Sequence, residues 1–427
     1  MEETFVPVAF EEAADIYVIN TCTVTAAADA QGKQLVRRAK AKNPGSFVVV
    51  TGCLAQDRPE EIRALAGVDL VVGNTEKSRL IKMIMNAWPV VGARHADLPF
   101  NIQGDRFSPL GHALPLPTHD ESSPWGGGIS RFDGHQRAIL KVQDGCNFGC
   151  SFCLIPRVRG TMVSRSVVEI VEEGKRLAQG GVKELVLAGI QLSSYGRDWG
   201  MAAEEPRLAP VIEKLLAIPG LQRVRLSSYA VADFEDALLP LWKSQSGLCP
   251  HLHLPLQSGD EGILKAMRRP YTLKRYRETI EKIRKNAPHL GLTSDIIAGF
   301  PGETEEAFQN TLDRIHEFDF ADFHPFPYSD RSGTPGEEMA PKVSPAIIRD
   351  RMGRLGMLKK ECQERSARLA QGRTFSLIVE RHGKKGFSGL SPEGLRVFLQ
   401  GEAGGLGLEI RVKVEGINEG RALACLL

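Results

Sequence analysis

The feature that most constrains the fold is an alternation of short apolar runs with longer helix-forming runs between about residues 136 and 370. Strands that alternate with helices favour a parallel sheet, because each helix returns the chain to the start of the next strand. Six such units predict a partial (β/α)6 barrel, in which functional side chains gather at the C-terminal strand ends. The six predicted strands are residues 138–142, 184–188, 223–227, 251–256, 292–298 and 321–326.

Three cysteines follow the first of these strands closely. Residues 145–153 have the sequence Gly-Cys-Asn-Phe-Gly-Cys-Ser-Phe-Cys, so Cys146, Cys150 and Cys153 have Cys-x3-Cys-x2-Cys spacing. Thiolates hold iron–sulfur clusters, and three of them leave one iron of a four-iron cube able to bind a cofactor or substrate. A zinc site and buried structural cysteines are the alternatives. Zinc prefers four closed ligands in paired knuckles, and no second Cys or His pair follows nearby.

Composition sets broader bounds. The 427 residues are 42% hydrophobic and 25% charged, which favours two to three domains with a sizeable core. No apolar run approaches transmembrane length and the chain starts with acidic residues, so neither a membrane span nor a signal peptide is expected. The eight cysteines are expected as thiols in a reducing cytoplasm and not as a disulfide framework. A net charge of +2 neither demands nor excludes nucleic acid.

The N-terminal region, residues 1–88, also alternates between strand and helix, which predicts a small parallel α/β domain. Cys22 and Cys53 come directly after the predicted strands 15–20 and 47–51. The C-terminal strand edge is where open α/β sheets bind ligands. A lone cysteine at a strand end is more often buried packing, but two at equivalent strand ends favour a ligand role.

Two further segments complete the domain prediction. Residues 89–135 are rich in Pro, Gly and Ser without periodicity, which predicts a linker before the barrel domain, 136–370. Residues 371–427 contain four short β-like runs separated by glycine-rich turns, which predicts a small β-barrel. Cys249, Cys362 and Cys425 have no partners at ligand spacing and are expected to be structural.

These motifs together resemble the radical S-adenosylmethionine (SAM) methylthiotransferases. The three spaced cysteines with Phe152 before the last resemble the radical SAM motif, and residues 18–25 and 48–56 resemble the family's N-terminal domain. The resemblance implies that Cys146, Cys150 and Cys153 hold a [4Fe–4S] cluster whose open iron binds SAM. It also implies that Phe152 lies against the adenine of SAM, that Gly189 lies beside its methionine moiety, and that the C-terminal barrel is an RNA-binding TRAM domain.

The resemblance also implies a second, auxiliary [4Fe–4S] cluster on three cysteines of the N-terminal domain. Cys22 and Cys53 match two of them, but no cysteine precedes Cys22, where the family supplies the third. Either the chain lacks a first strand that carries this cysteine, or the third ligand is not a cysteine of this chain. A parallel sheet without its first strand would expose a hydrophobic edge, which complete proteins avoid. This consideration favours a truncated start.

Residues 141–146 and 153–160 most resemble the tRNA threonylcarbamoyladenosine branch of the family. That branch adds a methylthio group to C2 of N6-threonylcarbamoyladenosine at position 37 of tRNA, a C–H bond that needs radical chemistry. The implied partners are tRNA and a reducing electron donor, and no catalytic side chain is predicted. The alternatives are the same chemistry on isopentenyl-adenosine tRNA or a ribosomal-protein aspartate, and a non-catalytic iron–sulfur protein that binds RNA. The basic segment 265–271 is either a phosphate-contacting loop or a solvated helix end.

Overall fold

The computed structural model describes residues 5–427 except residues 7, 93–136, 202–204, 206, 245–246, 384–385, 402–406 and 419–420. The predicted linker, 89–135, lies almost wholly outside the described residues. The chain divides into two compact units, and each is described by itself. The smaller unit comprises Met1–Gly127, Phe152–Thr161 and Ser329–Thr334, and the larger comprises Gly128–Ser151, Met162–Tyr328 and Pro335–Leu427.

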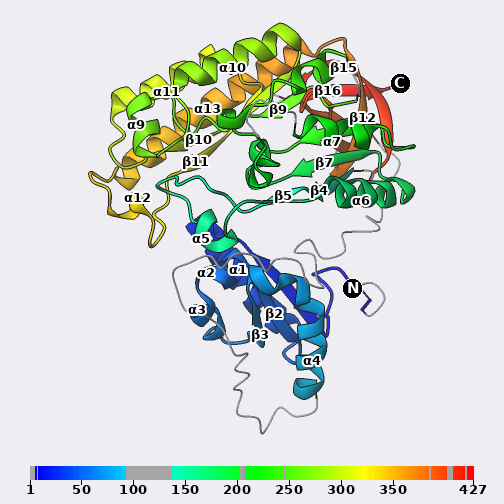
Figure 1. The fold of residues 1–427 in the computed structure, drawn as a ribbon, viewed down its shortest axis with the longest axis vertical. Helices are drawn as coiled ribbons and strands as arrows, with labels where there is room; N and C mark the ends of the chain where they lie inside the picture. Colours follow the sequence, from blue (N-terminus) through cyan, green and yellow to red (C-terminus); the bar gives the residue numbers. More distant parts are fainter. Residues whose placement is uncertain are drawn as a thin grey trace. The chain divides into compact units, whose positions relative to one another are not determined.

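The smaller unit is built on a parallel sheet with the strand order β1-β2-β3 (Figure 1). Every residue of β2 is buried, which is typical of a central parallel strand covered on both faces. Val48 and Val50 belong to one apolar cluster, whereas Phe47 and Val49 belong to another, as the alternation of side chains along a strand requires. The predicted small α/β domain is therefore confirmed. The strands are β1 (Ile16–Thr21), β2 (Phe47–Gly52) and β3 (Leu70–Val72).

Helices cover this sheet. Thr25 caps the first helix, because its hydroxyl accepts a hydrogen bond from the Ala28 N–H at 3.2 Å. A short helix that follows the Cys153 region in sequence also belongs to the smaller unit. The helices are α1 (Ala26–Lys42), α2 (Cys53–Asp57), α3 (Pro59–Arg63), the 3-10 helix η1 (Asn74–Arg79), α4 (Leu80–Gly92) and α5 (Ile155–Arg159).

The larger unit contains the predicted partial barrel. Two parallel sheets, β4-β7-β8 and β9-β10-β11, are joined by isolated bridges from Val224 to Leu248 and from Ser228 to His253. The six strands therefore follow one another in chain order around one curved sheet, as the sequence predicts. They are β4 (Arg137–Lys141), β7 (Glu184–Ala188), β8 (Arg223–Leu226), β9 (His251–His253), β10 (Gly291–Ala298) and β11 (Asp322–Pro327).

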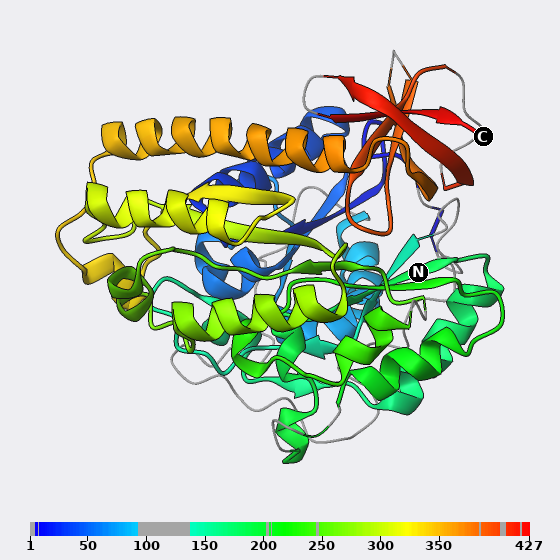
Figure 2. The same ribbon diagram turned by 90° about the horizontal axis from the view of Figure 1, so that it is seen from above.

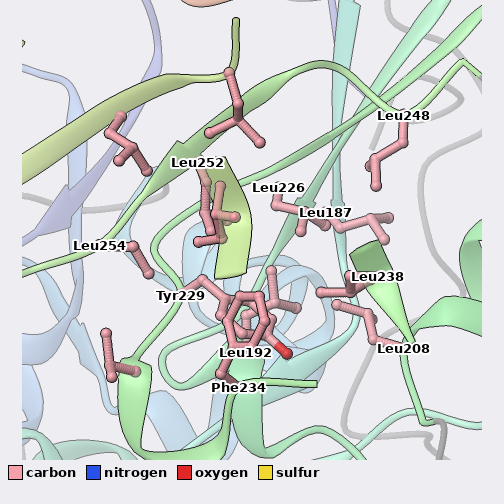
Figure 3. Packing of buried hydrophobic residues seen from close by; sticks show 14 of the residues in the cluster. Leu187, Leu192, Leu208, Leu226, Tyr229, Phe234, Leu238, Leu248, Leu252 and Leu254 are labelled. Atoms are coloured by element: carbon pink, nitrogen blue, oxygen red, sulfur yellow. The ribbon is translucent and has the colours of Figure 1, made fainter. Parts of the chain in front are cut away.

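One apolar cluster fills the space between these strands and their helices. Figure 3 shows Leu252 and Leu254 near Tyr229 within it. Ser166 caps the helix that follows it, because its hydroxyl accepts from the Glu169 N–H at 3.3 Å and donates to the Glu169 carboxylate at 2.7 Å. The remaining elements are β5 (Gln143–Asp144), β6 (Val163–Ser164), α6 (Val167–Gln179), η2 (Leu192–Ser194), η3 (Arg197–Trp199), α7 (Ala209–Leu216), η4 (Val231–Asp233), α8 (Leu238–Lys243), α9 (Glu261–Ala266), α10 (Leu273–Asn286), α11 (Glu305–Glu317), α12 (Pro335–Glu338) and α13 (Pro345–Leu369).

The C-terminal segment forms the expected small barrel, closed in the order β12-β13-β14-β16-β15. Helix α13 joins it to the partial barrel, because Leu355 and Cys362 pack in the core of the partial barrel and Ala367 packs in the core of the small barrel. Figure 2 shows α13 running along the unit to the small barrel. Among the described residues, no helix has the length and apolarity to span a membrane. The strands are β12 (Thr374–Gly383), β13 (Gly386–Leu390), β14 (Arg396–Leu399), β15 (Glu409–Asn418) and β16 (Arg421–Leu426).

A buried ionic cluster fastens the small barrel to the starts of β4, β7 and β8. Glu184, which is fully buried, accepts hydrogen bonds from Arg137, Arg223 and Arg225 at 2.7–3.3 Å. Arg225 also donates to the carbonyl oxygens of Ser391 and Pro392, both at 3.0 Å. Since the two domains share these charges, we call residues 137, 184, 223 and 225 the junction cluster.

Candidate functional site

The larger unit carries two of the three spaced cysteines in the loop after β4 and β5. Cys146 Sγ accepts a hydrogen bond from the Phe148 N–H at 3.4 Å and lies 2.9 Å from the side-chain oxygen of Gln191. Burial raises the pKa of the Cys146 thiol, and the Phe148 N–H opposes that rise. Gln143 holds the turn, since its side-chain amide donates to the Gly145 carbonyl at 2.8 Å and its oxygen accepts from the Gln191 N–H at 2.8 Å.

The side chain of Gln143 also explains a glycine at the C-terminal end of β7. A Cβ on Gly189 would lie 2.9 Å from the Gln143 side-chain oxygen and 3.0 Å from its Cβ. The close approach of two strand ends therefore requires a glycine here. This packing accounts for Gly189 without a ligand, so its predicted contact with SAM stays a prediction.

Cys150 is buried and faces a positive charge. Its sulfur accepts a hydrogen bond from the Arg269 guanidinium at 3.3 Å, and that guanidinium also lies over the Tyr271 ring, 5.1 Å from its centre. Burial lowers the pKa of Arg269, but the nearby Tyr271 and Cys150 outweigh burial and the net pKa is raised. A fixed cation at a thiol favours the thiolate, which is the form that binds iron. Within the segment 265–271, Arg269 thus contacts a cysteine.

The same loop is tied to the end of α9. The backbone N–H of Ser151 donates to the Met267 carbonyl at 3.1 Å, and its hydroxyl donates to the Ala266 carbonyl at 2.8 Å. These bonds hold Cys150 and the Arg269 segment together, although about 120 residues separate them in sequence.

In the smaller unit, the strand register makes Cys22 and Cys53 neighbours. Thr21 and Gly52 are opposite each other at the ends of the parallel strands β1 and β2, and each cysteine is the next residue along. Parallel strands lie roughly 4.8 Å apart, so the two chains leave the sheet side by side. Cys22 is exposed and Cys53 is 6% exposed. The prediction that both follow equivalent strand ends is confirmed.

Hydrogen-bond donors surround the sulfurs of this unit. Cys53 Sγ accepts from the Arg159 guanidinium at 3.2 Å and from the Asn74 side-chain amide at 3.6 Å. Cys22 Sγ and Cys153 Sγ each accept from the N–H two residues further on, at 3.5 Å, as Cys146 does in the larger unit. Donors of this kind stabilise a thiolate or a cluster sulfur.

A buried ionic group lies at the start of α1. Asp29 pairs with Arg58 and Arg331, and Arg331 also donates to the Thr23 hydroxyl at 2.7 Å. Burial raises the pKa of Asp29, but the hydrogen bonds from Arg331, Thr23 and Arg58 outweigh burial. The net pKa is therefore below its usual value of 3.8. These bonds hold the segment Ser329–Thr334 within the smaller unit.

Comparison with known proteins gives this arrangement a family. The model of the Radical SAM superfamily matches residues 140–315, and that of the Uncharacterized protein family UPF0004 matches residues 1–73. The chain is 34% identical over 411 residues to the threonylcarbamoyladenosine tRNA methylthiotransferase MtaB of Bacillus subtilis, which covers 95% of this chain and 86% of that protein. The protein of the same name from Aquifex aeolicus is 38% identical over 376 residues, or 88% of this chain and 86% of that one. The chain belongs to the radical SAM methylthiotransferase family.

A solved structure gives independent support for the fold. The radical SAM methyltransferase TsrM from Kitasatospora setae, with cobalamin and a [4Fe–4S] cluster bound, is similar with a TM-score of 0.51. It is 16% identical, and the match covers 77% of this chain and 64% of TsrM. At that identity the likeness concerns the fold alone. As a member of the radical SAM superfamily, the methylthiotransferase uses an iron–sulfur cluster and SAM.

The structure places the predicted ligands of the methylthiotransferase in both units. Cys146 and Cys150 belong to the larger unit, and Cys153, Cys22 and Cys53 to the smaller. Among the described residues, no three His, Cys, Asp or Glu side chains converge closely enough to hold a metal ion. Phe152 is half-buried in the smaller unit. The ligand roles of these residues thus rest on sequence spacing and on the hydrogen bonds to their sulfurs.

The methylthiotransferase also has a large cavity that the sequence did not reveal. Its volume is about 1530 Å³, and it lies within the larger unit between the inner face of the partial barrel and the small barrel. Seven arginines and four acidic residues line it, and this excess of positive charge suits a polyanion. On the small-barrel side, Arg421 lies over the Phe398 ring at 4.8 Å and Arg373 over the Phe375 ring at 4.9 Å.

Two features were not predicted from the sequence: the contacts of Arg269 and Arg159 with cysteine sulfurs, and the polar inner face of β9 to β11. Arg269 and Arg159 reach sulfurs through contacts between distant segments, which no local spacing encodes. The inner face did leave a signal, because His251 and His253, Thr293 and Asp295, and Asp322 and His324 are each two residues apart.

Proposed function

We propose that this chain adds a methylthio group to C2 of N6-threonylcarbamoyladenosine at position 37 of tRNA. The observation that carries the proposal is the similarity to threonylcarbamoyladenosine tRNA methylthiotransferases over 95% of the chain, which includes both cysteine-bearing regions and the small barrel. The substrate is tRNA, which also sets the expected compartment as the cytoplasm.

Cys146, Cys150 and Cys153 are proposed as the ligands of the radical SAM [4Fe–4S] cluster. The donor set suits iron, because Phe148, Ile155 and Arg269 each donate to one of these sulfurs and so favour the thiolate. Phe152 and Gly189 are proposed to contact SAM. When bound, cluster and SAM supply the radical chemistry that an unactivated C–H bond requires, given electrons from a reducing donor.

Cys22 and Cys53 are proposed as two ligands of an auxiliary [4Fe–4S] cluster that handles the sulfur. Because the two cysteines lie at neighbouring strand ends, they can bind the same cluster. The Arg159 and Asn74 side chains donate to Cys53 and would offset the negative charge of a cluster there. A residue or molecule other than these two cysteines completes the ligand set of this cluster.

The side chains of the cavity bind and orient the tRNA. Arginines at its outer wall contact phosphates, which position a nucleic acid without reading its sequence. Phe398, beneath Arg421, offers an aromatic ring against which an unstacked base can lie. The barrel interior then receives the target base.

The proposal is tested by mass spectrometry of tRNA nucleosides from a bacterium whose own enzyme of this type has been deleted. Expression of this chain should produce 2-methylthio-N6-threonylcarbamoyladenosine and consume its precursor. The Cys150→Ala variant should restore nothing and lose SAM cleavage in vitro, whereas Cys53→Ala should keep uncoupled SAM cleavage and lose methylthiolation. Cys362→Ala, a buried cysteine away from both sites, is the matched control.

Two results would count against this assignment. Methylthiolation of isopentenyl-adenosine with none of the threonylcarbamoyl nucleoside would move the substrate to the other tRNA branch. Full activity of Cys53→Ala would show that Cys53 only packs.

A further inference from the structure

The three strands β9, β10 and β11 present a continuous polar face to the cavity. His251 and His253 alternate with buried leucines along β9, and Thr293 and Asp295 alternate with Leu292 and Ser294 along β10. Asp322 and His324 do the same on β11. All six line the cavity, whereas Leu252 and Leu254 belong to the apolar core. Because side chains two residues apart share one face of a strand, the pattern makes one continuous inner surface and not a set of isolated polar residues.

Strand register brings these side chains into contact. His253 is opposite Thr293, and its Nδ1 lies 2.9 Å from the Thr293 hydroxyl, while its Nε2 lies 3.2 Å from the Asp295 carboxylate. Asp295 is in turn opposite His324, whose ring centre is 5.7 Å from that of His253. Both nitrogens of His253 are therefore occupied, and its ring is held in one orientation.

In contrast, the ring nitrogens of His324 can hydrogen-bond to a ligand. It is exposed to the cavity, and among the described residues no hydrogen bond to its ring is present. Burial and then the charge of Lys359 lower its pKa, so the ring is neutral and can both donate and accept. Deeper in the same wall, Nδ1 of His251 and the Ser227 hydroxyl are buried without a hydrogen-bond partner among the described residues. Buried polar groups are seldom left so, which points to a polar ligand.

This face lies below the strand ends where the cysteine loop and Gly189 are found. Asp295 precedes the end of β10 at Ala298 by three residues, or roughly 10 Å at about 3.3 Å per residue. An adenine whose C2 is at the strand ends can thus extend its N6 substituent, which leaves the ring two atoms away from C2, toward this face.

We propose that Asp295 and His324, with His251 and Ser227 beside them, hold the polar N6 substituent of the target adenosine and select it over an apolar one, and that His253 positions the Asp295 carboxylate for this contact. The inference rests on the proposed function and deepens it. The threonylcarbamoyl group offers ureido N–H groups, a carbonyl oxygen, a hydroxyl and a carboxylate for these side chains. An isopentenyl group offers none and would leave them desolvated and unpaired, which sites of this kind reject strongly.

The experiment measures binding of three synthetic anticodon stem-loop RNAs to the full chain by fluorescence anisotropy. The RNAs are identical except that the adenosine beside the anticodon carries a threonylcarbamoyl group, an isopentenyl group or no N6 group. The wild-type chain should bind the first at least about tenfold more tightly than the other two. His324→Leu should reduce that preference by about tenfold while leaving the affinity for unmodified RNA within about twofold.

His316→Leu, an exposed histidine on α11 outside the cavity, is the matched control and should keep the preference. His324→Gln, which retains a hydrogen-bonding side chain, should recover part of it. If His324→Leu and His253→Leu both fold, as shown by wild-type affinity for unmodified RNA, and keep the full preference, the inference is wrong. Equal binding of all three RNAs by the wild type also overturns it. Product analysis separates these failures from the main proposal, because a chain that still methylthiolates the threonylcarbamoyl RNA has the proposed function without this selectivity.

Discussion

The junction cluster makes a quantitative prediction for Glu184→Gln. Burial raises the pKa of Glu184, but the charges of Arg225 and Arg137 outweigh burial and lower it from 4.5 to about 2. A difference of that size corresponds to on the order of 3 kcal/mol between the charged and neutral forms. Removing one partner of a buried ionic group costs about 3–5 kcal/mol, because the remaining charges stay buried without compensation. The substitution should therefore destabilise the larger unit by about 3–5 kcal/mol.

Hydrogen exchange measured by mass spectrometry is the suitable assay, since a chain of two units is not expected to unfold in one step. Peptides from β7 and β12 should lose protection by at least about 100-fold in Glu184→Gln, and peptides from β2 in the smaller unit should not change. Glu361→Gln, an exposed residue of α13, serves as control. A loss of less than about tenfold at β7 would refute the reasoning.

The lowered pKa of Glu184 also predicts how the stability of the larger unit depends on pH. Because the folded pKa of Glu184 lies below its unfolded value, its contribution is complete above about pH 4.5 and is lost as the pH falls toward 2. The protection of wild-type β7 should thus approach that of the variant only in this acidic range. A difference that shrinks near neutral pH would point to another group.

Two further predictions concern the sites themselves. Asp29→Asn should lower the urea midpoint of the smaller unit, and the difference from wild type should shrink as the pH falls below about 4, because the hydrogen bonds that lower the pKa of Asp29 act on its charged form; a difference independent of pH would contradict this. Arg269→Gln should make the reduction potential of the reconstituted radical SAM cluster more negative, since a positive charge beside Cys150 is lost. A redox titration followed by electron paramagnetic resonance measures this potential. Arg269→Lys, which keeps the charge, should stay near the wild-type potential, and an unchanged potential in both variants would show that Arg269 only packs.

The strand pattern of the partial barrel was predictable, because short β-like runs alternate regularly with helix-forming runs along this part of the chain. The predicted strand 251–256 is nevertheless only His251–His253, since Pro255 follows and cannot donate to a ladder. In the C-terminal segment, β13 was not predicted at all. Its glycines suggested turns, yet a Cβ on Gly389 would lie 2.1 Å from the Ile378 carbonyl, so the glycine serves a close strand crossing in a small closed barrel.

Some residues of the candidate site could likewise be predicted from the sequence and others could not. The cysteines could be found because spacing in sequence reflects a loop or a strand end, and the neighbouring positions of Cys22 and Cys53 followed from parallel pairing alone. Arg269 on Cys150 could not be found, because that contact joins the ends of a loop and a helix that tertiary packing alone brings together.

The way in which Arg225 reaches the small barrel has a consequence for how the enzyme selects its target. Its guanidinium bonds to two main-chain carbonyls, so the attachment does not depend on which side chains occupy those positions. Arg225 and α13, which packs in both cores, together attach the small barrel rigidly to the partial barrel, so that it acts as a fixed arm. An RNA held by that arm is presented at a constant reach. Nucleotides one place nearer or farther along the strand would then be refused by distance, before any group on the base is inspected.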